Sequence, residues 1–148
     1  MQDAVAQDAV FAGKRSSWQS AIEVFKPRIG LEIMFAGIAG VAMAQGAGLP
    51  LSQLLVLATA VFLAAASAGA LNHLVERDLD ARMSRTRGRP FVTGKLAGGS
   101  LWIAVIGLLL AFAVVSAGLA TDWLAAAFVV LGAFTYGVVY TLWLKRRT

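Results

Sequence analysis

The sequence predicts an all-α fold in which several apolar helices cross a lipid bilayer as a bundle. Of its 148 residues, 59% are hydrophobic and only 14% are charged. Charged residues make up about a quarter of an ordinary soluble domain, so this composition is too apolar for one. The apolar residues also fall into runs of about 20, which is the length that an α-helix needs to cross the hydrocarbon core.

Four such runs can be read, separated by breaks rich in glycine, proline or charge. They cover residues 29–47, 51–71, 101–119 and 123–144. At about 1.5 Å rise per residue, each run gives a helix of about 30 Å. We expect the second helix to continue past the membrane core to about Asp80, because no helix-breaking residue comes before Gly88.

The distribution of lysine and arginine predicts the orientation of these helices. All thirteen basic residues lie in the segment 1–28, in the loop 77–100 or at the end of the chain, and the other two loops have none. Cytoplasmic loops are enriched in lysine and arginine, so these three parts should face the cytoplasm, with residues 29–148 forming a transmembrane domain. Topology therefore explains the net charge of +5 better than a nucleic-acid partner does.

Several other function classes are excluded by what the sequence lacks. It has no cysteine, which removes disulfides, thiolate metal sites and cysteine nucleophiles. It has no Walker-type loop, Rossmann glycine pattern or Ser-His-Asp set. Small residues do recur every four positions, which predicts close packing between helices. These are Ala36, Gly40 and Ala44, then Ala65 and Gly69, then Ala133 and Gly137.

Asn72, Glu76 and Asp80 are the strongest candidates for a functional site. They are four residues apart, so a helix places one amide and two carboxylates along one face, with Asp78 pointing away from it. Such oxygen ligands suit a hard cation, and Mg²⁺ fits best. A helix end reaching the membrane interface would explain Asp80 and partly Glu76. It explains Asn72 poorly, because polar residues after a long apolar run are costly and often functional.

A group of basic residues follows this acidic face directly. It contains Arg77, Arg82, Arg85, Arg87, Arg89 and Lys95. Guanidinium groups bind phosphate oxygens through paired, charge-assisted hydrogen bonds, so a cation together with arginines suits a diphosphate. Taken alone, these residues favour the simpler interpretation of topology residues attracted to anionic lipid.

The remaining polar residues of the apolar runs have ordinary interpretations. His73 is rotated about 100° from the residue before it, and packing is favoured over ligation of a metal or heme iron. Glu32 lies four residues after Arg28, which predicts an ion pair within one helix. Tyr136 and Tyr140 share a helix face and either line a cavity or lie at the membrane interface.

Three segments resemble the family of UbiA-type intramembrane prenyltransferases. Residues 72–90, with Asn72-x3-Glu76-x3-Asp80 followed by Arg85 and Arg89, resemble its first aspartate-rich motif. Residues 25–28, Phe-Lys-Pro-Arg, resemble its Lys-Pro-Arg segment ahead of the first span. Residues 140–148 resemble its Tyr-Thr and Leu-Lys-Arg segment after the fourth span. His73 stands where hydroxybenzoate-type members usually carry Asp, so the resemblance is nearest to the heme-prenylating branch.

The resemblance implies transfer of a farnesyl group from farnesyl diphosphate to a vinyl group of heme b. The product, heme O, would serve terminal oxidase assembly, which makes a terminal oxidase or heme A synthase the implied assembly partner. Asn72, Glu76 and Asp80 would be the catalytic residues and would hold Mg²⁺. The implied substrate-binding residues are Lys26, Arg85, Arg89, Tyr140, Lys145 and Arg146.

The chain departs from the family pattern in two ways. Glu76 stands where the family usually has Asp, and its carboxylate should still coordinate Mg²⁺ although it is one methylene longer. The family forms a nine-helix bundle with a second aspartate-rich motif in its C-terminal half, and this sequence contains no such motif. We therefore expect the 148 residues to represent the N-terminal half of such an enzyme and to be inactive alone.

Two alternatives remain open from the sequence. The first is a related prenyltransferase that acts on an aromatic quinone precursor, which only the acceptor used in an assay would distinguish. The second is a membrane scaffold without catalytic activity, which predicts no dependence on a divalent cation and tolerance of Asn72→Ala.

Overall fold

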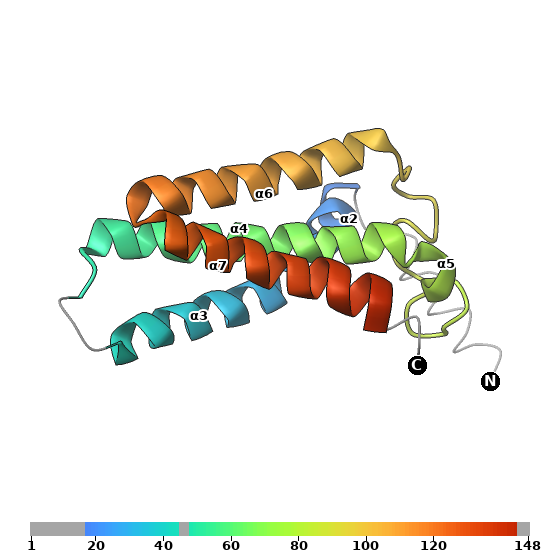
Figure 1. Cartoon of the computed structure of the whole chain (residues 1–148). Helices are drawn as coiled ribbons and strands as arrows, with labels where there is room; N and C mark the ends of the chain where they lie inside the picture. Colours follow the sequence, from blue (N-terminus) through green and yellow to red (C-terminus); the bar gives the residue numbers. More distant parts are fainter. Residues whose placement is uncertain (1–16, 45–47, 145–148) are drawn as a thin grey trace.

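The computed structural model describes residues 17–44 and 48–144, and this part of the chain is helical without any β-strand. The predicted all-α class is therefore confirmed. The elements are α2 (Ser17–Val24), α3 (Pro27–Met43), α4 (Leu51–Val75), α5 (Arg77–Asp80), α6 (Ser100–Ala120), α7 (Trp123–Phe134) and the π-helix η1 (Thr135–Leu144) (Figure 1). The loop 81–99 and the end of η1 lie at the same end of the bundle as α5.

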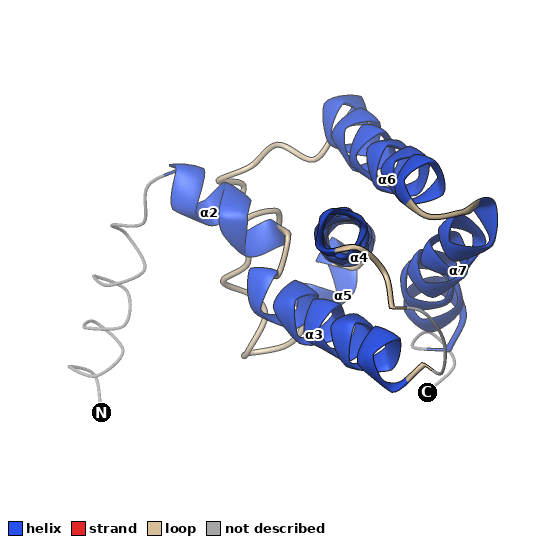
Figure 2. Cartoon of the chain, turned by 90° about the vertical axis from the view of Figure 1, so that its left-hand side faces the viewer, coloured by secondary structure: helices blue, strands red, loops and turns tan. Residues whose placement is uncertain are grey.

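Helix α4 occupies the middle of the bundle. Seen along its axis, it is surrounded by α3 and α2 on one side and by α6 and α7 on the other (Figure 2). Its buried residues are mostly small: Ala58, Ala60, Ala64, Ala66, Ser67, Ala68, Gly69 and Ala70. Small side chains let neighbouring helix backbones approach closely, which is how helices associate where lipid removes the usual hydrophobic driving force.

The contact of α4 with α6 and α7 is made largely of alanine. Ala60 and Ala64 of α4 belong to one buried cluster with residues of the two later helices. Those partners are Ala113, Ala117, Ala126, Val129 and Ala133. With so little side chain between the helices, added volume has no space to enter, so this part of the core is sensitive to larger residues.

Three helices in the described part of the chain are long and apolar enough to cross a membrane. They are Leu51–Val75, Ser100–Ala120 and Trp123–Leu144, and they match the second, third and fourth predicted spans closely. The first predicted span, 29–47, differs, because α3 has 17 residues and ends at Met43. At 1.5 Å per residue it is about 26 Å long, short of the hydrocarbon thickness. Residues 45–47 lie outside the described residues.

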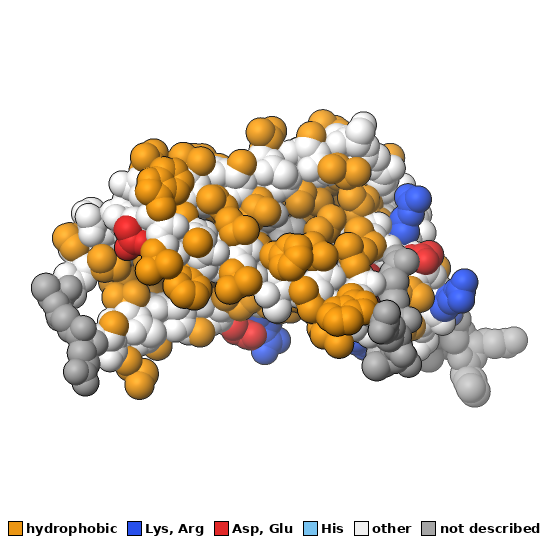
Figure 3. All heavy atoms as spheres, viewed as in Figure 1, with side chains coloured by type: hydrophobic (Ala, Val, Ile, Leu, Met, Phe, Trp, Pro, Cys, Tyr) orange, Lys and Arg blue, Asp and Glu red, His pale blue; other side chains and the backbone are white. Residues whose placement is uncertain are grey.

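The outer surface is covered with large hydrophobic side chains along the length of the bundle (Figure 3). Phe112, Leu119 and Phe128 are each more than 60% exposed. Most of the lysine and arginine side chains visible in the same view lie towards the end that carries α5. A soluble protein rarely exposes so large an apolar surface, whereas an integral membrane protein presents it to lipid or to further helices.

The helix that carries the acidic face is bent, which corrects the prediction of one continuous helix to Asp80. Helix α4 ends at Val75, Glu76 leaves helical geometry with φ −91° and ψ 7°, and α5 begins at Arg77. The helical hydrogen bonds nevertheless continue, from Glu76 N–H to Asn72 O (3.0 Å) and from Asp80 N–H to Glu76 O (2.8 Å). The three side chains of the acidic face therefore keep their four-residue register across the bend. The sequence has no glycine or proline at this point from which the bend could have been predicted.

The fourth predicted helix has the predicted bounds but changes type along its length. From Thr135 onwards it is a π-helix, in which hydrogen bonds connect residues five apart. At the transition, the Thr135 hydroxyl donates to the carbonyl of Leu131 (2.8 Å). Such back-bonding by threonine is known to distort helices. The change of helix type decides which side chains of η1 face α4.

The small-residue pattern predicts a close helix contact correctly at Gly137, whereas Gly69 meets the turn before α3 and Gly40 meets no neighbouring helix among the described residues. A β-carbon on Gly137 would lie 3.4 Å from Leu71, and one on Gly69 would lie 3.5 Å from Lys26, so both glycines are in close contact with neighbours. Apart from the backbone of α3, no described atom lies within 4 Å of a β-carbon built on Gly40. Gly40 instead lines an open groove beside α3.

We expect Gly118→Ala to lower the free energy of unfolding by about 1–3 kcal/mol, because overpacking a tight contact carries a cost of that order. The new β-carbon would lie 2.6 Å from the Trp123 ring at the turn between α6 and α7. Gly107→Ala in the same helix is the control, since apart from the backbone of α6 no described atom lies within 4 Å of its β-carbon. Thermal unfolding in detergent micelles, followed by circular dichroism, measures both. Equal midpoints for the two variants would contradict the tight turn.

Candidate active site

The predicted acidic face is buried at the polar end of α4. Asn72, Glu76 and Asp80 are 2%, 0% and 1% exposed. Asp78, which the spacing places on the opposite side, is exposed as predicted. Burying an amide and two carboxylates costs free energy unless they are hydrogen-bonded or paired, so the neighbouring elements must supply partners.

The side chain of Asn72 connects three parts of the chain. Lys26 Nζ, just before α3, donates to Asn72 Oδ1 at 2.6 Å and to the Tyr136 hydroxyl at 3.2 Å. Asn72 Nδ2 donates to Thr141 Oγ1 of η1 at 3.2 Å. The predicted site residue Lys26 is thus brought to the acidic face, together with two residues of η1.

The position of Lys26 depends on an unusual backbone conformation. Its φ of 47° and ψ of 57° make it the one non-glycine residue with positive φ in the described part of the chain. This left-handed conformation costs free energy and is often found at functional sites. Pro27 follows at the first position of α3, where its fixed φ suits a helix start and disfavours a helical residue before it. The resulting turn carries the lysine side chain across Gly69 towards Asn72.

Asp80 is held by the loop that follows it. The Arg89 guanidinium donates to Asp80 Oδ2 in a salt bridge, and the Thr86 hydroxyl donates to the Asp80 carbonyl at 3.0 Å. The loop therefore folds back over the end of α5, so that side chain and backbone of the same aspartate are both fixed. A guanidinium and a carboxylate form one of the stronger hydrogen-bonded pairs in proteins.

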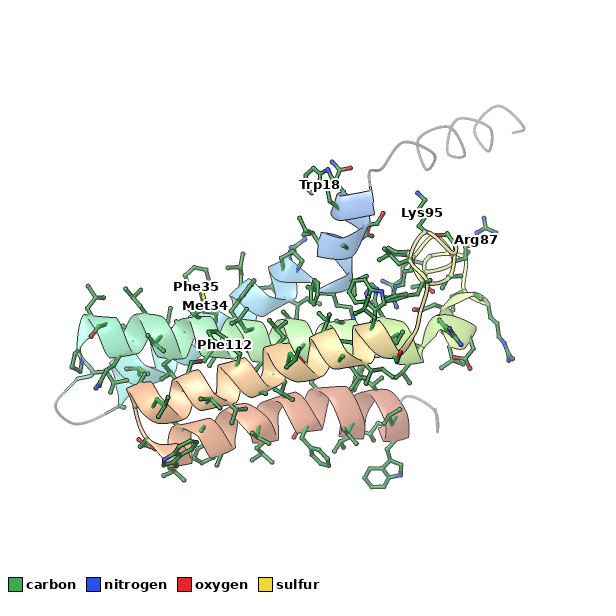
Figure 4. All side chains as sticks on the ribbon, turned by 90° about the horizontal axis from the view of Figure 1, so that it is seen from above. Trp18, Met34, Phe35, Arg87, Lys95 and Phe112 are labelled. Carbon is green, nitrogen blue, oxygen red and sulfur yellow. The ribbon has the colours of Figure 1, made fainter. Side chains whose placement is uncertain are left out.

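The other basic residues of α5 and of the loop are exposed to a larger extent. The exposed members are Arg77, Arg82, Arg85, Arg87 and Lys95. Arg87 and Lys95 project from the outer side of the loop (Figure 4). The predicted substrate-binding residue Arg85 is exposed, and within the described residues no hydrogen bond or ion pair joins it to the acidic face. Exposed arginines beside apolar helices suit the topological role that was the simpler interpretation.

Aromatic side chains anchor this loop to the bundle. Phe91 packs edge-on against Trp102 of α6 with ring centroids 5.2 Å apart, and Phe25 lies 6.1 Å from the same ring. Aromatic pairs in these geometries are favourable beyond the apolar area that they bury. The loop and the turn that carries Lys26 are thereby held against the same residue of α6.

Lys26, Asn72 and Tyr136 form a polar cluster, joined by the hydrogen bonds of the lysine. An apolar groove of about 790 Å³ leads to this polar cluster. Its lining comes from α3, α4 and α7, and it includes Ile38, Val61, Phe128 and Gly132. Tyr136 lines the groove and also accepts the hydrogen bond from Lys26, so the groove reaches the polar cluster at this residue. An elongated hydrocarbon with a charged head group would match this combination of surfaces.

Four further residues that the sequence analysis discussed lie outside the polar cluster. Tyr140 is half-exposed and stacks on Tyr136 with ring centroids 6.1 Å apart, and both line a second pocket next to the groove. Glu32 and Arg28 form the predicted exposed ion pair, with Nε and Oε1 3.3 Å apart. His73 is buried in α4, in keeping with a packing role.

Lys145 and Arg146, predicted to bind substrate, lie outside the described residues.

Sequence reasoning did not single out Thr86 and Thr141 and considered Tyr136 only as a residue of a cavity wall. Thr86 lies within the segment that resembles the aspartate-rich motif, and Thr141 lies within the Tyr-Thr segment. Their position in those segments was the only indication in the sequence that these two threonines belong to the site. Their contacts could not be read from it, because they depend on the folded loop and on the π-helix.

The donor set fits a Mg²⁺ ion whose coordination is completed by substrate. No group of three or more His, Asp or Glu side chains able to hold a metal occurs within residues 17–44 and 48–144. The acidic face offers two carboxylates and one amide, and Asn72 and Asp80 also bind basic side chains. Mg²⁺ commonly uses one or two carboxylates, with waters and substrate phosphates at the other positions. A site of this composition does not need a complete cage of protein ligands.

These features define an intramembrane protein with a polar site at the end of an apolar groove, and comparison identifies its family. The chain belongs to the UbiA prenyltransferase family, whose model matches residues 33–148. The predicted family is therefore confirmed. No solved structure matches the chain.

Named relatives of the chain belong to the heme branch. Protoheme IX farnesyltransferase 2 of Paramagnetospirillum magneticum is 50% identical over 126 residues, which cover 84% of this chain and 43% of that protein. Protoheme IX farnesyltransferase of Brucella ovis is 37% identical over 150 residues, covering 100% of this chain and 47% of the relative. That of Parvibaculum lavamentivorans is 38% identical over 137 residues, covering 92% and 42%. The chain thus spans less than half the length of these relatives, and their names do not favour the aromatic acceptor.

We expect Arg89→Ala to lower the free energy of unfolding by about 1–3 kcal/mol, because it leaves the buried Asp80 carboxylate without this guanidinium. Adding Asp80→Asn should recover part of the loss, since the charge that needed compensation is then removed. Arg87→Ala is the matched control and should stay within about 0.5 kcal/mol of the unmodified protein, because Arg87 is exposed in the same loop. Unfolding in detergent measures the free energy of unfolding of all three variants. Equal losses for Arg87→Ala and Arg89→Ala would show that the salt bridge between Arg89 and Asp80 does not stabilise the fold.

Proposed function

We propose that the protein containing this chain transfers a farnesyl group from farnesyl diphosphate to a vinyl group of heme b, giving heme O for terminal oxidase assembly. The observation that carries the proposal is the apolar groove that ends at the hydrogen-bonded cluster of Lys26, Asn72 and Tyr136. The family supports prenyl transfer, and the names of the relatives support heme as the acceptor.

The groove and the cluster divide the binding of the donor between them. The isoprenoid chain lies against the apolar walls of α3, α4 and α7, which bury its surface. The diphosphate lies at the polar end, where Lys26 supplies positive charge and Arg89 orients Asp80. Asn72, Glu76 and Asp80 would hold Mg²⁺ there, and the ion would supply positive charge that stabilises the departing diphosphate.

The reaction needs no redox partner, because every electron pair comes from the two substrates and water. The bond between C1 of the farnesyl chain and the diphosphate oxygen breaks, and its electron pair leaves with the diphosphate. The π electrons of the heme vinyl group form the new carbon–carbon bond to C1. Water adds to the vinyl carbon next to the ring and loses a proton, which leaves a hydroxyl group. The apolar walls keep water away from C1 until the new bond has formed.

The proposed location is the inner membrane of a bacterium, with the loop 81–99 on the cytoplasmic side. The exposed arginines and lysine of that loop support this orientation, because basic residues favour the cytoplasmic face. Proteins that consume heme O, a terminal oxidase or heme A synthase, are the proposed assembly partners. Farnesyl diphosphate would then reach the site from the aqueous side, with its chain entering the membrane.

We expect Asp80→Ala to lower heme O formation by about 100-fold or more, which is the usual effect of removing one electrostatic contact from a reacting charge. The assay uses membranes with the protein expressed from its complete gene, supplied with heme b and farnesyl diphosphate, and detects heme O by mass. Asp78→Ala is the matched control and should stay within about twofold, because Asp78 is exposed two residues away.

The same assay tests the cation and the acceptor. Chelation of Mg²⁺ should abolish the product, and hydroxybenzoate in place of heme b should give no prenylated compound. Near-normal activity of Asp80→Ala would remove this aspartate from the site. Product formed without a divalent cation would remove Mg²⁺ from the proposal.

We expect Gly132→Leu to raise the KM for farnesyl diphosphate about tenfold, because a mismatch of a few carbon atoms in an apolar pocket is worth that much. Gly132 lines the groove, and apart from the backbone of α7 no described atom lies within 4 Å of a β-carbon built on it, so the new side chain would occupy the groove. Gly107→Leu, on α6 and likewise in open space, is the control. Equal KM values for the two variants would show that the farnesyl chain lies elsewhere.

A further inference from the structure

The orientation of the Asn72 amide is fixed by the chemistry of its neighbours. A lysine ammonium group has hydrogens to donate and no lone pair to accept with. The amide atom that lies 2.6 Å from Lys26 Nζ is therefore the oxygen, Oδ1. The other atom is the nitrogen, Nδ2, and it faces Thr141 Oγ1 at 3.2 Å.

The hydrogen bonds of the Thr141 hydroxyl group require the same orientation of the amide. Thr141 is 0% exposed, and its Oγ1 donates its one hydrogen to the carbonyl of Tyr136 at 3.0 Å. With that hydrogen used, Oγ1 can only accept from Asn72. A reversed amide would place its oxygen against the lone pairs of Oγ1 and its NH₂ group against the lysine ammonium, and both contacts are repulsive.

The π-helix is the reason that Thr141 reaches this position. In an α-helix, residues five apart differ by about 140° around the axis. In a π-helix, hydrogen bonds join residues five apart and bring them to the same side. Tyr136, which contacts Lys26, and Thr141, which contacts Asn72, are five apart in η1. The π-helix thus allows one helix to hold both members of the cluster.

We propose that Thr141 is a positioning residue that keeps the Asn72 oxygen turned towards the cation and the diphosphate. The inference rests on the proposed function and adds to it a residue that does not itself touch substrate. An amide oxygen has two lone pairs, so Asn72 Oδ1 can accept from Lys26 and still ligate a cation. Groups that orient a ligand in this way typically contribute a factor of about 10 to 100 to metal affinity.

The test measures binding of Mn²⁺, used as a spectroscopic substitute for Mg²⁺, to the protein expressed from its complete gene. Electron paramagnetic resonance reports free Mn²⁺ in the presence of inorganic pyrophosphate, so neither heme nor turnover is involved. Thr141→Val keeps the shape and removes the hydroxyl, Thr141→Ala removes it without bulk, and Thr141→Ser retains it. Thr59→Val is the matched control, because its hydroxyl is exposed on α4 and bonds to Leu55 instead, away from the π-helix.

We expect the valine and alanine variants at Thr141 to weaken Mn²⁺ binding about tenfold, while Thr141→Ser and Thr59→Val stay within about twofold. A purely structural role would lower the unfolding midpoint of the valine variant and leave the Mn²⁺ affinity of the folded fraction unchanged. That result would overturn the inference. Equal weakening in the serine variant, or no Mn²⁺ binding by the unmodified protein, would overturn it too.

A separate experiment tests the proposed function. It fails if the unmodified protein forms no heme O when heme b, farnesyl diphosphate and Mg²⁺ are supplied. An unmodified protein that binds Mn²⁺ with the expected pattern of variants but forms no heme O would support the role of Thr141 and reject heme as the acceptor.

Discussion

The hydrogen bond between Lys26 and Asn72 is the contact on which the arrangement of the site depends. A buried amide at the end of an apolar helix costs free energy unless its donors and acceptor are satisfied. Here the acceptor is satisfied from the segment before α3 and the donor from η1, so the turn before α3, α4 and η1 are fixed relative to one another by a single side chain. The small residues of α4 make this possible, because they allow the surrounding helices to come close enough for short side chains to meet.

Two backbone irregularities occur where this cluster is built. Lys26 adopts a left-handed conformation, and η1 is wound as a π-helix. Each is less favourable than a regular helix, and each brings a polar side chain to Asn72 that a regular helix would direct elsewhere. The free energy that they cost is offset by the hydrogen bonds that the buried amide would otherwise lack. Irregular geometry of this kind is typical of positions under functional constraint.

The site combines an apolar groove with a charged end, and the two parts have different chemical roles. The groove offers apolar area without any specific polar contact, whereas the polar end offers charge at a defined point. Arg89 and Thr86 hold Asp80 from the loop, so the carboxylate does not depend on substrate for its orientation. Most of the other basic side chains of the loop remain exposed, so they are separate from the charged groups that hold Asn72 and Asp80.

The sequence by itself determined the helical class, the bounds of the three long spans and the buried face of Asn72, Glu76 and Asp80. These are local properties, since run length and four-residue spacing act along one helix. Only the tertiary structure decided the bend at Glu76, the short α3 and the π-helix. It also decided which residues meet Asn72, because Lys26 and Thr141 lie 46 and 69 positions away in the chain. Contacts at that separation depend on how helices pack and where their backbones depart from regular geometry, and no periodicity within a single segment encodes them.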